Sequence, residues 1–256
     1  MILCFTGTGN SRLVALELQR HIGGEVVMLC GDLLTNPSGT VLEVPAGEPV
    51  VWVCPVYSWG LPPVVNRFIR RSKIKGAHEA PHFLVCTCGD DVGRADDRWR
   101  KLVGRRGWSP RGAFSVTMPN TYVCMSGFDT DTPEVADTKV AAMPERVAGI
   151  APRIMAGFAD SDVTRGSWAW MKTWVIYPLF CATCMSPKPF HTTADCISCG
   201  LCARSCPTGN IAMADGHPVW GRDCALCLRC YHICPTHAVQ YGRETAAKGQ
   251  SSNLQL

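Results

Sequence analysis

Eight cysteines in the last part of the chain fall into two copies of one pattern. Each copy reads Cys-x2-Cys-x2-Cys-x3-Cys-Pro, the first from Cys196 to Pro207 and the second, 28 residues later, from Cys224 to Pro235. Three thiolates spaced three residues apart can bind three irons of one cubane from a single loop, whereas the fourth cysteine follows a longer gap and points away. The pattern therefore predicts two iron–sulfur clusters.

Two structural zinc sites are the simpler alternative, because zinc needs only four ligands from two Cys-x2-Cys pairs. Zinc would leave the third cysteine of each copy and both prolines without a role. Small residues such as Ser198, Gly200 and Ala225 would let backbone N–H groups approach the cluster sulfurs. The cysteine pattern thus favours clusters over zinc.

Residues 191–241 resemble the bacterial two-cluster [4Fe-4S] ferredoxin along their whole length. In that family the fourth cysteine of each copy binds the cluster of the other copy. The resemblance implies one cluster on Cys196, Cys199, Cys202 and Cys234, and a second on Cys224, Cys227, Cys230 and Cys206.

A second motif lies near the amino terminus, where Thr6-Gly7-Thr8-Gly9-Asn10-Ser11 follows an apolar strand and opens a helix. Hydroxyl groups and unpaired N–H groups at a helix N-terminus suit a phosphate. An ordinary strand-to-helix turn capped by Ser11 is the alternative. The dinucleotide fingerprint would need a further glycine where Arg12 stands, so a nicotinamide cofactor is disfavoured.

This motif resembles the FMN phosphate loop of flavodoxins, T-x-T-G-N-S/T. The resemblance implies that the phosphate is held by Thr6, Thr8, Gly9, Asn10 and Ser11. It also implies flavin-ring contacts from two later loops, with stacking by Tyr57 and Trp59 and backbone N–H groups beside Gly89. The last loop departs from the family, because Cys88-Gly89-Asp90 lacks the usual stacking aromatic residue.

The elements that would position these motifs alternate between strand and helix. Apolar runs predict strands at 2–5, 25–29, 50–54, 82–87 and 112–118, and amphipathic stretches predict helices at 11–21, 62–73, 94–106 and 133–160. Such alternation predicts a doubly wound α/β domain whose parallel sheet is covered on both faces. Ligands of such domains bind outside the carboxyl ends of the strands.

These patterns divide the chain into four parts. We expect a flavodoxin-like FMN-binding domain at 1–160, an aromatic connecting segment at 161–190, a small α+β ferredoxin domain at 191–241, and a polar tail at 242–256 without regular structure. The aromatic stretch from Trp168 to Phe180 leaves three interpretations open: a helix between the domains, a strap over the cluster domain, or a docking patch for a membrane surface or a partner.

The order of the two domains resembles the flavodoxin–ferredoxin fusion proteins of anaerobic microbes. Clusters carry single electrons and a flavin holds two, so the resemblance implies an electron relay between two [4Fe-4S] clusters, FMN and a redox partner protein. One alternative is a flavin-dependent reductase of a small acceptor, such as a quinone, nitro compound or corrinoid. Another is a module that presents clusters to a partner without flavin. No acid, base or nucleophile arrangement indicates catalytic residues.

The composition indicates the cellular location of the protein and the classes of partner that it does not bind. The 256 residues include 16 cysteines and no export signal, which predicts a reducing, cytoplasmic location. The formal charge of +4 does not indicate nucleic-acid binding. The sequence contains no uninterrupted run of about 18 apolar residues, so we expect no transmembrane helix. The sequence predicts neither the identity of the partner nor the oligomeric state.

Overall fold

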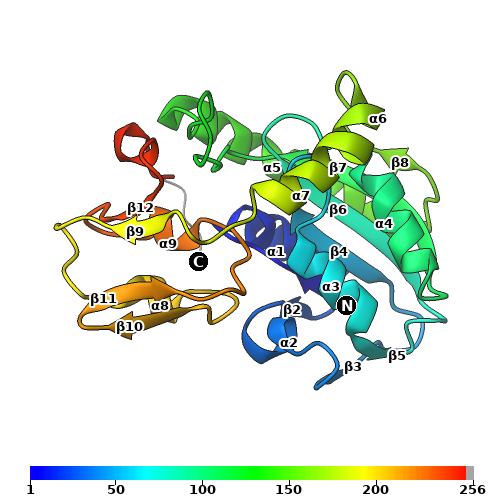
Figure 1. The fold of residues 1–256 in the computed structure, drawn as a ribbon. Helices are drawn as coiled ribbons and strands as arrows, with labels where there is room; N and C mark the ends of the chain where they lie inside the picture. Colours follow the sequence, from blue (N-terminus) through cyan, green and yellow to red (C-terminus); the bar gives the residue numbers. More distant parts are fainter. Residues whose placement is uncertain (252–256) are drawn as a thin grey trace.

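The computed structural model describes residues 1–251, and their centre is a six-stranded parallel sheet (Figure 1). Its strand order is β2-β1-β4-β6-β7-β8. The strands span Val26–Met28, Ile2–Cys4, Val50–Pro55, Pro81–Cys88, Ser109–Thr117 and Ser161–Asp162, in that order. Without the edge strand β8, this is one of the two common doubly wound orders, with its topological switch point between β1 and β4.

Helices cover both faces of the sheet because successive residues of each strand point to opposite sides. Ile2 and Cys4 pack on one face, under α1 (Asn10–Ile22) and α5 (Pro133–Met155). Leu3 packs on the other face, under the helices α3 (Pro63–Arg71) and α4 (Ala95–Gly104). The predicted doubly wound α/β architecture is confirmed.

Four short elements beside this core were not predicted. The helix α2 (Gly31–Thr35) follows β2, and the strands β3 (Val41–Glu43) and β5 (Lys73–Lys75) form a separate parallel pair. The two-residue strand β8 extends the main sheet. The three strands among these elements have only two or three residues and, unlike the equally short β1 and β2, do not consist of apolar residues throughout, so no apolar run predicts them.

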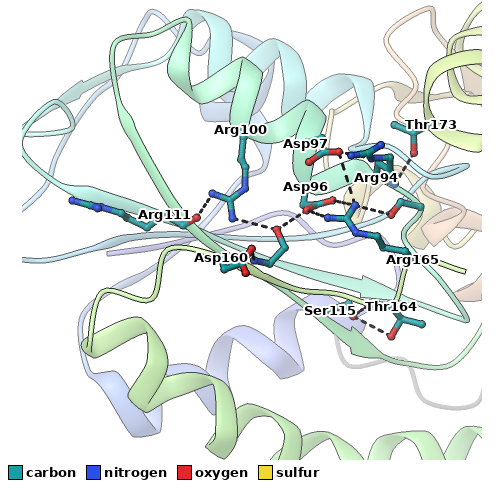
Figure 2. Close-up of polar contacts among 12 residues, drawn as sticks. Arg94, Asp96, Asp97, Arg100, Arg111, Ser115, Asp160, Thr164, Arg165 and Thr173 are labelled. Carbon is teal, nitrogen blue, oxygen red and sulfur yellow. Dashed lines mark hydrogen bonds and ion pairs between the residues drawn. The ribbon is translucent and has the colours of Figure 1, made fainter. Parts of the chain in front are cut away.

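The aromatic stretch forms a helix that packs on the α/β domain, as α6 (Ala169–Met171), η1 (Lys172–Ile176) and α7 (Tyr177–Thr183). Figure 2 shows the polar contacts that fix the residues before and within this helix. The Arg165 guanidinium donates to the buried Asp96 carboxylate at 2.7 and 3.0 Å, and the Thr173 hydroxyl accepts the Arg94 N–H at 2.8 Å. The connecting segment is therefore attached to α4.

A small α+β domain follows, as the sequence predicts. The strands β9 (Phe190–Thr192) and β12 (Val239–Tyr241) pair antiparallel, as do β10 (Ile211–Ala214) and β11 (His217–Trp220), with the short helices α8 (Leu201–Arg204) and α9 (Arg229–His232) between them. Figure 1 shows this domain beside the carboxyl ends of the parallel strands.

Part of the prediction for the tail is wrong. Residues 242–251 pack on the protein and include the short helix η2 (Thr245–Ala247). The Lys248 ammonium donates to the carbonyl oxygen of Val123 at 2.7 Å, and the Gln250 amide donates to that of Tyr231 at 2.7 Å. The polar side chains thus satisfy backbone carbonyl groups. The same prediction for residues 252–256 lies outside the described residues.

None of the helices in residues 1–251 combines the length and the apolar character that a membrane-spanning helix requires.

Candidate metal centre

The two cysteine repeats fold in the same way. Residues with positive φ recur at the same 28-residue offset, and so do the short helices α8 and α9. The matched pairs are Ser198 (56°) with Leu226 (48°), Gly200 (68°) with Leu228 (60°), and Gly209 (59°) with His237 (54°). Left-handed residues turn successive N–H groups toward one point, which makes a concavity that holds anionic groups. Each repeat therefore wraps its backbone around one centre.

Each centre is a pocket lined by four of the predicted ligands. One pocket is lined by Cys196, Cys199 and Cys202 of the first repeat and by Cys234 of the second. The other is lined by Cys224, Cys227 and Cys230 of the second repeat and by Cys206 of the first. The structure therefore brings the eight cysteines together in the two sets that the ferredoxin resemblance implies. We name these pockets the outer and the inner cysteine pocket, respectively.

Backbone N–H groups point at the sulfur atoms in both pockets. The Asn210 N–H lies 3.3 Å from Cys206 Sγ, and at the equivalent place in the second repeat the Ala238 N–H lies 3.2 Å from Cys234 Sγ. The Leu226 N–H lies 3.3 Å from Cys224 Sγ. Such N–H groups stabilise the negative charge of thiolates and of the cluster they hold.

Burial raises the pKa of the cysteine thiols most strongly in the inner pocket. It raises the pKa of Cys224 to about 12 and that of Cys227 to about 11, so the free thiols keep their protons and metal binding must release them. Among the residues that the structure describes, no three His, Cys, Asp or Glu side chains are placed to hold a single metal ion.

The first-repeat loop at the outer pocket is exposed, and the equivalent second-repeat loop at the inner pocket is covered. Ile197 and Cys199 in the outer loop are both exposed, Ile197 by 63%. Ala225, which is equivalent to Ile197, is buried in the core of the α/β domain, and Cys227 packs against that core. The two pockets therefore differ in their access to molecules outside the chain.

The cover of the inner pocket is the loop after β1, at the topological switch point. A Cβ atom on Gly7 would lie 2.5 Å from the Cys227 carbonyl oxygen, so only glycine permits this contact. The Arg229 side chain donates to the carbonyl oxygens of Gly7 at 2.6 Å and Thr6 at 3.1 Å. Neither contact was predicted, because nothing in the sequence marks Arg229 as a residue between the domains.

The loop predicted to hold phosphate uses its polar side chains within the protein. The Thr6 hydroxyl accepts the Gly9 N–H at 3.0 Å, and Ser11 and Thr87 share a hydrogen bond of 2.8 Å. The segment after β7 covers the loop, since the Thr8 hydroxyl lies 3.4 Å from that of Thr121 and the Asn10 amide donates to the Pro119 carbonyl oxygen at 2.9 Å. Thr6, Thr8 and Ser11 are buried.

The loop at Gly89, predicted to contact the flavin ring, is also covered by protein. The side chain of Asn120 lies where a Cβ atom on Gly89 would be. Asn120 is held there by Asp131, which accepts its backbone N–H at 2.9 Å and its amide at 3.1 Å, and Asp131 accepts the Lys139 ammonium at 2.7 Å.

The two aromatic side chains predicted to stack on a flavin have other neighbours. Tyr57 packs in the α/β core beside Cys227. Trp59 lies against Gly93. The Lys172 ammonium is 4.9 Å from the ring centre of Trp59, and the carbonyl oxygen of Trp59 accepts a hydrogen bond from the Thr173 hydroxyl at 2.9 Å. In this conformation the residues around the switch point therefore do not fit an FMN, although the phosphate loop itself opens the 13-residue helix α1.

Comparisons with known proteins agree with the cysteine geometry. Residues 195–239 match the family model of the 4Fe-4S dicluster domain. A search of curated proteins found no match. Among solved structures, the chain is similar to the Trp repressor binding protein from Bacillus subtilis, with 11% sequence identity and a TM-score of 0.36 over 57% of this chain and 97% of that one. A 4Fe-4S dicluster domain implies iron–sulfur electron transfer.

Proposed function

We propose that this protein carries electrons to or from a redox partner protein through two [4Fe-4S] clusters. One cluster would bind Cys196, Cys199, Cys202 and Cys234, and the other Cys224, Cys227, Cys230 and Cys206. The observation that carries the proposal is the lining of the two pockets, each by three cysteines of one repeat and the fourth of the other. The match of residues 195–239 to the 4Fe-4S dicluster domain also supports it.

The unequal exposure of the two pockets gives the clusters different roles. A partner can approach the outer cluster, because Ile197 and Cys199 are exposed there. The Gly7 loop, which Arg229 bonds, would shield a cluster in the inner pocket, so electrons would reach that cluster through the outer cluster or through the α/β domain. The guanidinium of Arg229 also places a positive charge beside this cluster and favours its reduced form.

FMN binding at Thr6, Thr8, Gly9, Asn10 and Ser11 stays a prediction. The strand order and the helix N-terminus after β1 support it, because doubly wound domains bind ligands at this place. The cover by Pro119, Asn120 and Thr121 opposes it. A bound flavin would therefore require this segment to move away.

A second candidate function follows from the covering of the predicted phosphate loop by residues 119–121. A module that presents its clusters to a partner without flavin needs only a rigid support, and the α/β domain provides one through Gly7 and Arg229. Flavin analysis separates the two functions, since the relay requires about one FMN per chain and the module requires none. No observation in the structure favours the third alternative, the reductase of a small acceptor.

The test of the main proposal is stepwise reduction of the air-free protein, followed by absorbance and EPR. The proposal expects two reducible clusters, and it expects Cys234→Ser to disturb the cluster of the first repeat although Cys234 lies in the second. Cys30→Ser is the matched control, because Cys30 is an exposed cysteine that lines neither pocket. Loss of the second-repeat cluster alone in Cys234→Ser would show that the assignment of ligands is wrong.

A further inference from the structure

The tryptophan at the end of strand β11 carries a buried N–H group for which the described residues provide no acceptor. Trp220 Nε1 is shielded from solvent and has no hydrogen-bond partner within residues 1–251. A buried N–H without a partner costs free energy, so each such group calls for an explanation. Of the five buried side-chain nitrogen or oxygen atoms of this kind, only Trp220 Nε1 belongs to a residue that lines a cysteine pocket.

The indole ring of Trp220 is fixed beside the inner cysteine pocket. Trp220 pairs with Ile211 between β11 and β10, and both residues line this pocket. Phe190 of β9 stacks on the indole, with 5.3 Å between the ring centres and 9° between the ring planes. The side chain of Trp220 is near enough to the Cys230 thiol to oppose the rise in the pKa of Cys230 that burial causes, although the two groups do not reach ordinary hydrogen-bond geometry.

The other polar side chains that line the inner pocket already have partners. The Asn210 amide donates to a backbone carbonyl oxygen at 3.1 Å. Arg229 uses each of its three side-chain nitrogen atoms to bond a backbone carbonyl oxygen. The Thr208 hydroxyl lies 3.5 Å from Cys206 Sγ. Apart from the cysteines, the Trp220 N–H is therefore the side-chain donor that remains for a group bound in this pocket.

The outer pocket has no counterpart of Trp220. Thr192 takes the equivalent place, because each of the two residues lies four positions before the first cysteine of its repeat and at the same point of an antiparallel strand pair. Thr192 does not line the outer pocket. Apart from the cysteines, the lining side chain there with a donor group is Thr236, and its equivalent Thr208 is present in the inner pocket. Among the described residues, an indole donor thus lines one pocket and not the other.

We propose that the Trp220 N–H donates a hydrogen bond to a sulfur atom of the [4Fe-4S] cluster in the inner pocket and raises the reduction potential of that cluster. The inference rests on the proposed function, because it requires the cluster. Reduction by one electron adds one negative charge to the cluster and its thiolates. A donor bonds a more negative sulfur more strongly, so it stabilises the reduced form. The indole also gains an acceptor for its buried N–H.

The experiment is a redox titration of the intact, cluster-loaded protein without air, followed by EPR, for the unchanged chain and for Trp220→Phe. Phenylalanine keeps an aromatic ring against Phe190 but removes the N–H. The second-repeat signal is identified as the one that Cys206→Ser removes. At the potential that half reduces this cluster in the unchanged protein, the ratio of reduced to oxidised cluster should be three- to tenfold lower in Trp220→Phe. For a one-electron couple this is a shift of about 30–60 mV. The first-repeat signal should titrate as before.

The matched control is Trp99→Phe. Trp99 Nε1 is also buried without a partner among the described residues, but Trp99 lies in α4 and lines neither pocket. This variant should leave both potentials unchanged. A spectroscopic measurement tests the contact itself, in protein whose tryptophans carry nitrogen-15 in the indole. Pulsed EPR of the reduced second-repeat cluster should detect coupling to this nitrogen, which Trp220→Phe removes and Trp99→Phe retains.

The outcomes separate this inference from the proposed function. Two reducible clusters whose potentials are the same in Trp220→Phe and in the unchanged protein would overturn the inference alone. Absence of the nitrogen-15 coupling in the unchanged protein would do the same, and this measurement decides the question if Trp220→Phe does not retain its cluster. A protein without any reducible cluster would overturn the proposed function and the inference together.

Discussion

Replacement of Gly7 by Ala tests the contact between the inner cysteine pocket and the α/β domain. The added Cβ atom would lie 2.5 Å from the carbonyl oxygen of Cys227 and 2.9 Å from its Cβ atom. Both neighbours belong to the backbone or sit directly on it, so they cannot rotate away. The Cys227 loop must therefore shift, and with it one side of the inner pocket.

The size of the effect follows from overpacking. Extra carbon in a close-packed site costs about 1–3 kcal/mol. For a chain of this size each kcal/mol lowers the melting temperature by about 2–4 °C, so Gly7→Ala should melt roughly 2–12 °C earlier. None of the eight cysteines is changed, so iron should still be incorporated. Iron of the inner cluster should nevertheless be released faster to a chelator, because the loop that shields it has moved.

The control for this variant is Gly149→Ala. Gly149 lies within α5 and has no neighbour within 4 Å of the added atom, so Ala should stabilise the helix by about 0.5–1 kcal/mol. Differential scanning fluorimetry and chelator kinetics, performed without air, compare the two variants. If Gly7→Ala melts and releases iron as the unchanged protein does, the described docking of Cys227 on Gly7 is wrong.

Three further predictions concern ligation, pH and a buried charge. Cys206→Ser should remove the EPR signal of the second-repeat cluster and about half of the iron, and removal of the first-repeat signal instead would contradict the ligand sets. Burial lowers the pKa of His82 and of His232 to about 4, so unfolding takes up protons between about pH 6.5 and pH 4. The contribution of these two imidazoles to stability should be constant above pH 7 and lower at pH 5.5 by up to about 1.4 kcal/mol per imidazole, and a melting temperature that does not fall between pH 7 and pH 5.5 would contradict the neutral buried state. Arg165→Met should cost about 3 kcal/mol in chemical denaturation, because it leaves the buried Asp96 carboxylate without its cation, and an unchanged midpoint would show that the pair contributes nothing.

The cysteine sites could be predicted from the sequence because their information is local. The spacing from Cys196 to Cys206 recurs from Cys224 to Cys234, whereas the exchange of the fourth cysteine between the two pockets was implied only by the resemblance to two-cluster ferredoxins. The alternation of strands and helices could also be predicted. Strands such as 82–87 are buried on both faces, so they appear in the sequence as nearly continuous apolar runs.

The place where the domains meet could not be predicted in the same way. Arg229 contacts Thr6 and Gly7 more than 200 residues away, and no local pattern reports such a contact. Asn120 likewise follows a strand as an ordinary loop residue, yet it covers Gly89. A phosphate-loop motif predicts a local backbone shape, whereas the space beside that loop depends on segments that are distant in the sequence.

Two [4Fe-4S] clusters in the two cysteine pockets are the basis of the proposed function. The most direct measurement is iron, sulfide and zinc analysis of the protein purified without air, combined with EPR of the reduced sample. We expect about eight irons and eight sulfides per chain, with signals from two clusters. Stoichiometric zinc, or a sample without acid-labile sulfide, would contradict it.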